Sequence, residues 1–359
     1  MIYIGLSKIL ILLRYALANE GALRKVIYFC VFMGLFVFSA FRYQVGCDWD
    51  GYYYNYVTAE NFDWSKRSVL QEPIWWAILD WMQRFGLPYP VINVVSSAVF
   101  FLGVHSLARR QPEPLGFLVL LFPILIINMP MSGIRQGAAI GMMCIAFLAF
   151  IDRRPFWFAT WTILAGGFHV SALLFMLGVP LASGKFSIQR LILGAVLAAP
   201  GVVLIAIAAG AERVISTYVQ SEMHSSGAIF RVGLLVLTAL YFLISTRLKW
   251  KRTFPEDYNF AMLGVIVMMM TALLLLLSSV IADRYAYYLI PIQAMIFARL
   301  PYLPRRVNRI LHTAFPYLLI FTVFLVWTQT SIFFQRCYLP YQTWIFGFPG
   351  GDTNGLNGW

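Results

Sequence analysis

The sequence contains little charge for its length. Only 12% of its 359 residues are Asp, Glu, Lys or Arg, whereas soluble domains hold about a quarter. This scarcity excludes a soluble domain of ordinary composition. Runs such as LGVIVMMMTALLLLLSSVIA can cross about 30 Å of hydrocarbon and lack the polar alternation of a barrel strand. The composition predicts an all-α, polytopic integral membrane protein, a single transmembrane domain over residues 1–359 with about 9–12 transmembrane helices.

Signatures of several other protein classes are missing. The four cysteines have no C-x-x-C spacing, no G-x-G-x-x-G follows a strand, and no P-loop occurs. These absences argue against a zinc site and a nucleotide site, so no cofactor is predicted, and dependence on a divalent cation is left open. The net charge of +12 could suggest nucleic acid. In a membrane protein, basic cytoplasmic loops explain it better, and we expect no nucleic-acid partner.

Basic residues alternate between the two sides of nine apolar segments. These candidate spans are 26–41, 88–107, 115–131, 134–151, 188–209, 231–246, 258–281, 284–299 and 313–333. Eighteen of the 27 Lys and Arg fall on one side, which the positive-inside rule makes cytoplasmic. The loop 42–87 and the C-terminal tail 334–359 should therefore lie outside. Cys47 and Cys337, one in each, could pair if that compartment is oxidising.

Two segments do not fit this simple alternation. Residues 1–19 are apolar but interrupted by Lys8 and Arg14, and they lack a cleavage site, so they either lie in the interface or cross as an extra span. The segment 155–182 has basic residues at both ends but is too short for two full spans. We expect a broken, re-entrant pair of half-helices meeting near Gly166 and Gly167, with His169 just after the break. One long tilted span is the alternative.

Arginine dominates the predicted outer side, where eight of nine basic residues are Arg. The planar guanidinium grips phosphate at two points. Arg135 and Arg284 occupy very short outer turns, where each would begin a helix, and a helix N-terminus also attracts anions. The pair favours an anion site over arginines that merely anchor helix ends in lipid. His169 lies within an apolar segment. It could act as a general base or donate a hydrogen bond to a phosphate oxygen, or it could be a packing residue.

The outer loop is acidic and aromatic. Its stretch VGCDWDGYYYNY contains Asp48 and Asp50, and the loop continues with Glu60, Asp63 and Glu72. A D-x-D pair often holds a metal and a nucleotide sugar, but nucleotide sugars are cytoplasmic, so we predict no metal site here. The carboxylates could deprotonate a sugar hydroxyl or simply be solvated. The Trp and Tyr rings suit sugar stacking or an interfacial belt. EPIWWAILDWMQRFG is typical of an amphipathic surface helix with Glu72 at its start.

Five motifs together resemble the EpsG-like branch of the Wzy-type polysaccharide polymerases. They are RYQVGCDWDGYYYNY, QEPIWWAIL, SGIRQGAAIGMMCIAFLAF, GGFHVSALLF and ADRYAYYLIP, in that order. The family pattern is an arginine before V-G-T-D with a tyrosine following, an E-P pair, an arginine opening a helix, a His-Ser and a late Arg-Tyr-x-x-Tyr. It falls on Arg42, Gly46, Asp48, Tyr52, Glu72, Arg135, His169, Ser171, Arg284 and Tyr288. Cys47 departs from the pattern, because threonine is usual there.

The resemblance implies a GT-C-like glycosyltransferase of the bacterial inner membrane, with its active site facing the periplasm. It would be an oligosaccharide repeat-unit polymerase for O-antigen, capsule or exopolysaccharide. Such an enzyme transfers a growing glycan from undecaprenyl pyrophosphate to the non-reducing end of a new lipid-linked repeat unit. Its partners would be that lipid-linked oligosaccharide and the membrane lipid, with a chain-length regulator left open. A lipid-linked oligosaccharide flippase and an O-antigen ligase-type transferase are the alternatives.

The resemblance also suggests roles for individual residues. Arg135 and Arg284 would bind the donor pyrophosphate, and either His169 or Asp48 would accept the proton of the acceptor hydroxyl. The expected substrate-binding residues are Arg42, Asp50, Tyr52, Glu72, Ser171 and Tyr288.

Overall fold

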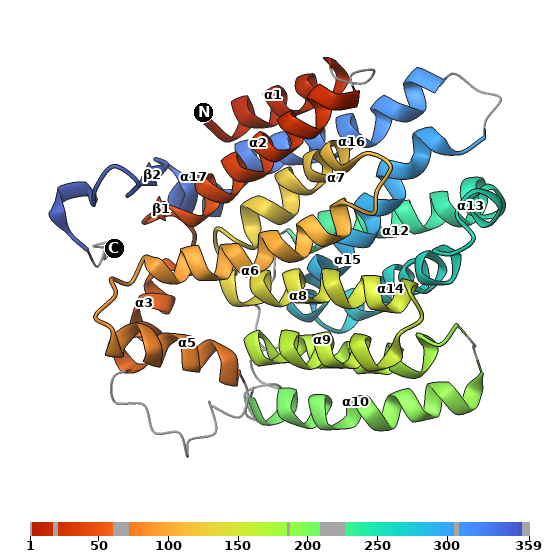
Figure 1. The fold of residues 1–359 in the computed structure, drawn as a ribbon, viewed down its shortest axis with the longest axis horizontal. Helices are drawn as coiled ribbons and strands as arrows, with labels where there is room; N and C mark the ends of the chain where they lie inside the picture. The colour runs from red at the N-terminus through yellow and green to blue at the C-terminus, as the bar shows by residue number, and fades with distance from the viewer. Residues whose placement is uncertain are drawn as a thin grey trace. The chain divides into compact units, whose positions relative to one another are not determined.

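A computed structural model describes residues 2–16, 21–59, 72–184, 187–208, 227–304 and 309–353. The α-helices are α1 (Ile2–Ala16), α2 (Gly21–Ala40), α3 (Trp49–Thr58), α5 (Pro73–Arg84), α6 (Val91–Ala108), α7 (Pro114–Leu121), α8 (Ile134–Ile151), α9 (Pro155–Phe168), α10 (Ile188–Ala208), α12 (Ala228–Tyr241), α13 (Arg247–Thr253), α14 (Tyr258–Leu277), α15 (Ser279–Arg299), α16 (Arg309–Thr330) and α17 (Ile332–Tyr338) (Figure 1). The other elements are η2 (Phe122–Ile126), η3 (Val170–Leu181), η5 (Phe242–Thr246), η6 (Leu300–Tyr302), η7 (Pro349–Gly351), β1 (Arg42–Tyr43) and β2 (Gln342–Thr343). Glu60 and Asp63 lie outside the described residues.

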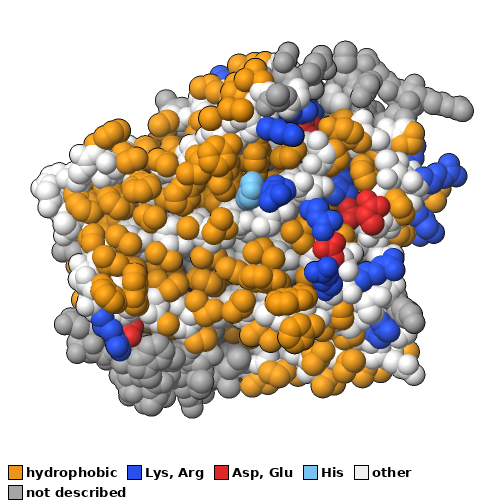
Figure 2. All heavy atoms as spheres, viewed as in Figure 1, with side chains coloured by type: hydrophobic (Ala, Val, Ile, Leu, Met, Phe, Trp, Pro, Cys, Tyr) orange, Lys and Arg blue, Asp and Glu red, His pale blue; other side chains and the backbone are white. Residues whose placement is uncertain are grey.

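The structure confirms an all-α, polytopic membrane protein. Within the described ranges, six helices are long and apolar enough to cross a membrane: Leu23–Ala40, Val91–Ala108, Ile134–Ile151, Ala228–Thr253, Tyr258–Leu277 and Thr313–Thr330. Three further apolar helices are shorter, namely Pro114–Ile126, Val170–Leu181 and Ile188–Val203. On the face drawn in Figure 2, hydrophobic side chains cover a broad area and charged ones gather mainly toward one edge.

The chain forms two compact units. The first comprises Met1–Gly141, Gly167–His169 and Tyr317–Trp359, and the second comprises Met142–Gly166 and Val170–Pro316. Helix α8 begins in the first unit and continues into the second. Each unit is described by itself below.

In the first unit, α1 lies along α2 in the opposite direction. The Tyr3 ring packs against Phe38 near the end of α2, at 5.5 Å between centroids, and its hydroxyl donates to the Tyr338 carbonyl. At the other end of α1, Arg14 binds Glu113, which also binds Arg24 near the start of α2. Helix α1 is therefore held against α2 at both of its ends.

The end of the chain is fastened to the loop that follows α2. Strand β2 pairs antiparallel with β1, joining Arg42 to Thr343 and Tyr43 to Gln342. A disulfide joins Cys47 to Cys337, 290 residues later. The sequence predicted that these two cysteines could pair, and they are paired in the structure.

A buried aromatic cluster joins α3 and α5 to the start of α8. Trp49 and Tyr52 come from α3, Trp75 and Leu79 from α5, and Ile134 from α8. On α5 the buried residues Trp75, Leu79 and Met82 recur at helical spacing, whereas Trp81 is exposed. The predicted amphipathic helix is therefore present, and its apolar face packs on protein.

The segment after Arg154 forms the expected broken pair, most of which belongs to the second unit. Helix α9 ends at Phe168, and η3 begins at Val170. The two pieces run back along each other, because a Cβ at Gly166 would overlap Leu173 and one at Gly178 would touch Phe158. The break comes at His169 itself, slightly later than the two glycines, which still belong to the helix. At about 1.5 Å per residue, α9 rises about 21 Å, too little to cross the bilayer alone.

Two ion pairs join helices of the second unit, one half-buried and one buried. Arg231 on α12 binds Asp283 on α15 through both carboxylate oxygens, at 2.5 and 2.7 Å. Arg299 at the end of α15 binds Asp257 before α14. Charges within apolar helices require such partners, so these pairs hold α12, α14 and α15 in register.

Candidate active site

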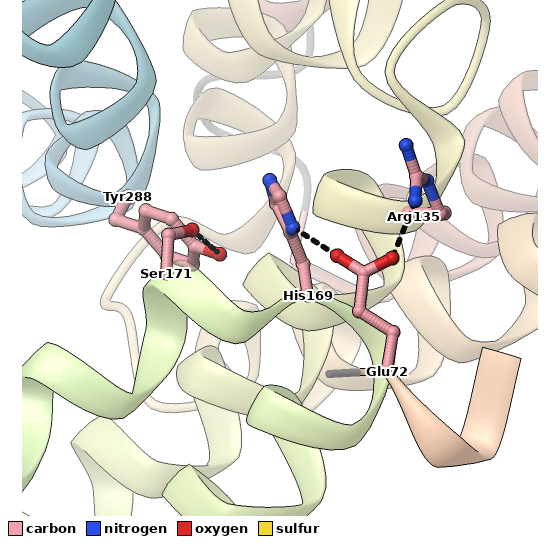
Figure 3. Close-up of polar contacts among 5 residues, drawn as sticks. All are labelled: Glu72, Arg135, His169, Ser171 and Tyr288. Atoms are coloured by element: carbon pink, nitrogen blue, oxygen red, sulfur yellow. Dashed lines mark hydrogen bonds and ion pairs between the residues drawn. The ribbon is translucent and has the colours of Figure 1, made fainter. Parts of the chain in front are cut away.

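Helix α5 presents the carboxylate of Glu72. Pro73 occupies the first helical position, where its fixed φ suits the helix, and Glu72 is the N-cap. The side chain makes no hydrogen bond to its own helix. Instead Oε1 lies 2.6 Å from His169 Nδ1, and Oε2 accepts a hydrogen bond from Arg135 Nη1 (Figure 3). The predicted helix start is confirmed, and the carboxylate bridges two other segments.

The break in the broken helix presents His169. Its backbone belongs to neither α9 nor η3, so its side chain can reach a partner from another element. The side chain is 13% exposed. When the imidazole is neutral, a hydrogen bond to the Glu72 carboxylate places the proton on Nδ1 and leaves Nε2 as an acceptor. This is the tautomer that a general base needs.

Arg135 is the second residue of α8, so the predicted position at a helix N-terminus is confirmed. Its guanidinium carbon lies 5.5 Å from the Tyr52 ring centroid and 6.0 Å from that of Trp75. The ring faces attract the cation and limit its movement. Its side chain is nevertheless 33% exposed. A guanidinium held in this way at a helix start can meet an anion from solvent.

The surroundings of Glu72 keep it charged. Burial acts to raise the pKa of its carboxyl, but the Arg135 charge and the hydrogen bond with His169 outweigh burial, so the pKa is lowered from its ordinary 4.5. Burial dominates at Tyr52, where it raises the pKa against the opposing charge of Arg135. A carboxylate, a guanidinium, an imidazole and a protonated phenol therefore lie together at neutral pH. We call Glu72, Arg135 and His169 the glutamate triad.

The second unit contains a separate contact between two predicted site residues. Ser171 Oγ on η3 and Tyr288 Oη on α15 lie 3.0 Å apart, and both side chains are buried (Figure 3). The hydrogen bond ties the start of η3 to α15. Ser171 follows His169 by two positions in the chain, so this bond also limits movement just after the break.

The two aspartates of the outer loop are placed differently from the triad. Asp48 is exposed, and its Oδ2 accepts a hydrogen bond from Ser132 Oγ at 3.3 Å. Asp50 is half-buried in the first turn of α3. Of the two predicted bases, His169 is therefore the one that a buried carboxylate orients.

Arg42 is buried and contacts the backbone. Its side chain is only 1% exposed, and it donates to the carbonyls of Ser39, Val45 and Met131. Burial lowers the pKa of Arg42 to about 10, which leaves it charged at neutral pH. These contacts hold two turns together. Its role in binding the acceptor remains a prediction.

Arg284 is exposed, but it does not begin its helix. Helix α15 starts at Ser279, because Ser278 adopts an extended conformation and its hydroxyl accepts from the Ile281 N–H. This corrects the expectation that Arg284 opens a helix, since it lies in the second turn. Sequence reasoning also missed the neighbouring Asp283–Arg231 pair. The adjacent Asp and Arg in ADRYAYY were the available signal, because an intramembrane carboxylate needs a cationic partner.

No metal centre is evident in the described part of the chain. There, His, Cys, Asp and Glu side chains form no group of three or more that could hold an ion. The D-x-D pair has no further donor of these types beside it within the described ranges. Asp48 is exposed, and Asp50 lies in the first turn of α3.

Comparison with known proteins gives one match. The EpsG family model matches residues 25–343, which include every member of the glutamate triad and the Ser171–Tyr288 pair. Neither the search of curated proteins nor that of solved structures found a match. The family implies a polysaccharide polymerase of a glycosyltransferase-like kind, in keeping with a multi-pass membrane protein that handles lipid-linked sugars. The match covers most of the chain, which therefore belongs to the EpsG family.

Proposed function

We propose that this chain is an oligosaccharide repeat-unit polymerase of the bacterial inner membrane that works on the periplasmic side. It transfers a growing glycan from undecaprenyl pyrophosphate to the non-reducing-end hydroxyl of a new lipid-linked repeat unit. The observation that carries the proposal is the glutamate triad, in which one buried carboxylate orients an imidazole and a solvent-accessible guanidinium. Glycosyl transfer from a diphosphate needs both a base and a cation.

His169 is the base in this scheme. The acceptor hydroxyl gives its proton to Nε2 as its oxygen attacks the anomeric carbon of the donor sugar. The bond from that carbon to the diphosphate oxygen breaks, and the diphosphate leaves with the electron pair. Glu72 accepts the Nδ1 hydrogen bond throughout, so it stabilises the imidazolium that forms. Asp48 is the second candidate for this role, supported by its exposure and its place in the acidic loop.

Arg135 and Arg284 bind the donor diphosphate. A guanidinium next to the leaving oxygen stabilises the charge that develops there, and loss of one such donor typically costs about 10²–10³ in rate. Arg135 is supported by its exposure and by the rings that hold it. Arg284 is supported by its exposure on α15. Tyr52, Asp50, Ser171 and Tyr288 complete the substrate-binding set, and the buried Arg42 supports it from behind through its backbone contacts.

Reconstitution tests the proposal. Purified wild-type protein in lipid nanodiscs, given a lipid-linked repeat unit, should yield a ladder of longer lipid-linked glycans. His169→Ala and Arg135→Ala should lower the rate at least about 10²-fold. The matched controls are His105→Ala, which alters a partly buried histidine paired with Tyr28, and Arg84→Ala, which alters an exposed arginine on α5. Both controls should keep the ladder.

Two results would count against the proposal. The first is the absence of a ladder with wild type, and the second is an undiminished ladder with both triad variants. The surface glycans of cells that lack the protein distinguish a polymerase from a ligase. Loss of a polymerase leaves surface glycans one repeat long, whereas loss of a ligase leaves none attached.

A further inference from the structure

One covalent link reaches the segment next to the glutamate triad. Cys47 is bonded to Cys337, and the neighbouring Gly46 N–H donates to the Cys337 carbonyl at 2.7 Å. The tail that holds Cys337 is itself fixed, since Tyr3 donates to the Tyr338 carbonyl. We call residues 42–47, with their link to Cys337, the strap.

The strap packs on the turn that precedes α8. Arg42 Nε donates to the carbonyls of both Val45 and Met131, at 2.9 Å each, so one guanidinium joins the strap to the turn. Gly46 has φ +107°, and a Cβ there would overlap the Met131 carbonyl. The close approach and the positive φ both require glycine. Ser132 in the turn also bonds Asp48, just after the strap.

The turn in turn determines where α8 begins. Gly137 N–H donates to the Gly133 carbonyl at 2.8 Å, so the first turn of the helix is built on the residues the strap holds. Arg135 lies in that first turn. A displacement of the Met131–Gly133 turn would therefore move the Arg135 guanidinium relative to the Tyr52 and Trp75 rings and to Glu72.

We propose that the Cys47–Cys337 disulfide and Arg42 are positioning elements for Arg135, so that the enzyme reaches full rate only when the disulfide is formed. The rate meant here is that of glycan extension, so this inference rests on the proposed function, but the placement of Arg135 can be measured without turnover. Cys47 is exposed, so a soluble dithiol can reach the bond. Reduction adds two electrons and two protons to the cysteine pair, and the dithiol becomes the disulfide.

Kinetics of glycan extension provide the first test. Cys337→Ser, or dithiol treatment of wild type, should lower kcat/KM about tenfold, because a misplacement of about 1 Å at a charge-stabilising group is costly. Cys30→Ser is the matched control, since Cys30 is a free, exposed cysteine, and its kinetics should not change. Arg42→Lys keeps the charge but loses the forked contact, and it should resemble Cys337→Ser.

Coupling to Arg135 separates positioning from general stabilisation. In an Arg135→Lys background, Cys337→Ser should cost less than about twofold in kcat/KM, while its effect on thermal unfolding stays the same. An equal loss of rate in both backgrounds would overturn the proposal. So would a wild-type enzyme that keeps its rate when the disulfide is reduced.

A second measurement does not depend on turnover. Arg135→Cys in a Cys30→Ser background can be labelled with a charged thiol reagent, with the strap disulfide intact or replaced through Cys47→Ser and Cys337→Ser. A change in labelling rate supports the proposal, and equal rates refute it. If neither oxidised nor reduced wild type extends glycans, the proposed function fails while this labelling still tests the strap.

Discussion

The first unit contains two glutamate–proline pairs that begin helices, and their carboxylates have different surroundings. Glu72 precedes α5 and Glu113 precedes α7. In both, the proline favours an extended conformation at the glutamate and starts the helix, and neither carboxylate caps its own helix. Each bridges two basic side chains instead. The same local motif thus places one carboxylate on each predicted side of the membrane.

The basic partners of the two glutamates distinguish the two sites. Glu113 binds Arg14 and Arg24, and the Arg14 guanidinium lies 4.5 Å from each of the Tyr15 and Tyr317 ring centroids. The Arg14 and Glu113 side chains are only 6% and 2% exposed. This largely buried cluster can hold α1, α2 and α7 together. Glu72 instead binds a titratable histidine and an arginine that solvent reaches, which are the properties a reaction needs.

The largest expected effect comes from neutralising Glu72. Glu72→Gln keeps the size of the side chain but cannot stabilise an imidazolium or hold the Arg135 charge. We expect the rate of glycan extension to fall about 10²–10³-fold, in the range for loss of a charge-stabilising group. The measurement is kcat in nanodiscs, together with the apparent unfolding temperature.

A loss of less than about tenfold in kcat for Glu72→Gln would contradict this comparison, because the glutamate triad would then contribute no more to the reaction rate than the Glu113 cluster does. Glu72→Asp sharpens it. Aspartate keeps the charge but shortens the reach to His169, so its rate should lie between those of wild type and Glu72→Gln.

Neutralising Glu113 should have the opposite profile. Glu113→Gln leaves two arginines facing each other in a buried site, and breaking such a cluster typically costs about 3 kcal/mol or more of folding free energy. We expect a clear fall in unfolding temperature and in yield. The kcat of the folded fraction, measured after size-exclusion chromatography, should change less than about twofold. A large loss of kcat at unchanged stability would contradict the assignment.

Much of the fold could be predicted, because hydrophobicity and basic residues act locally. Among the described residues, six of the nine predicted spans match helices that are long and apolar enough to cross a membrane. The amphipathic helix after Glu72 and the break that follows α9 were predicted from periodicity and length, although the break comes at His169 and not at the two glycines. The start of α15 could not be predicted in the same way, because Ser278 caps the helix six residues before Arg284. A serine in an apolar run can also lie in the interior of a helix, so only its backbone conformation shows that Ser278 is the N-cap.

The candidate site was predicted as a set of residues but not as a set of contacts. Glu72 meets partners 63 and 97 residues away, and no local pattern encodes such pairings. The Glu113 cluster went unpredicted, although a signal was present. Arg14 interrupts an apolar run, and a charge in such a run requires a carboxylate partner. The E-P pair before the apolar run at 115–131 was the matching acid on the predicted cytoplasmic side.

A smaller effect should distinguish the aromatic rings beside the two arginines. Tyr52 packs by Arg135, and Tyr317 packs by Arg14. Burial raises the pKa of Tyr52, so its hydroxyl stays protonated and can orient Arg135. Tyr52→Phe should lower kcat/KM about threefold to tenfold, because one hydrogen bond contributes about 1 kcal/mol or somewhat more when one partner is charged. Tyr317→Phe should leave kcat/KM unchanged, because Tyr317 contacts Arg14 of the Glu113 cluster. Equal effects of the two variants on kcat/KM would remove the distinction.

The smallest effect concerns the pH dependence of stability. Because Arg135 and His169 lower the pKa of Glu72 below its ordinary 4.5, the carboxylate is more favourable in the folded protein than in the unfolded chain. Its contribution is therefore fully present above pH 4.5 and is lost as the pH falls through the lowered value. The difference in unfolding temperature between wild type and Glu72→Gln should stay constant from about pH 7 to about pH 5 and shrink only in stronger acid. Shrinkage beginning at higher pH would mean that burial outweighs the effects of Arg135 and His169 on the pKa of Glu72, and Glu72 would then be too easily protonated to keep His169 oriented.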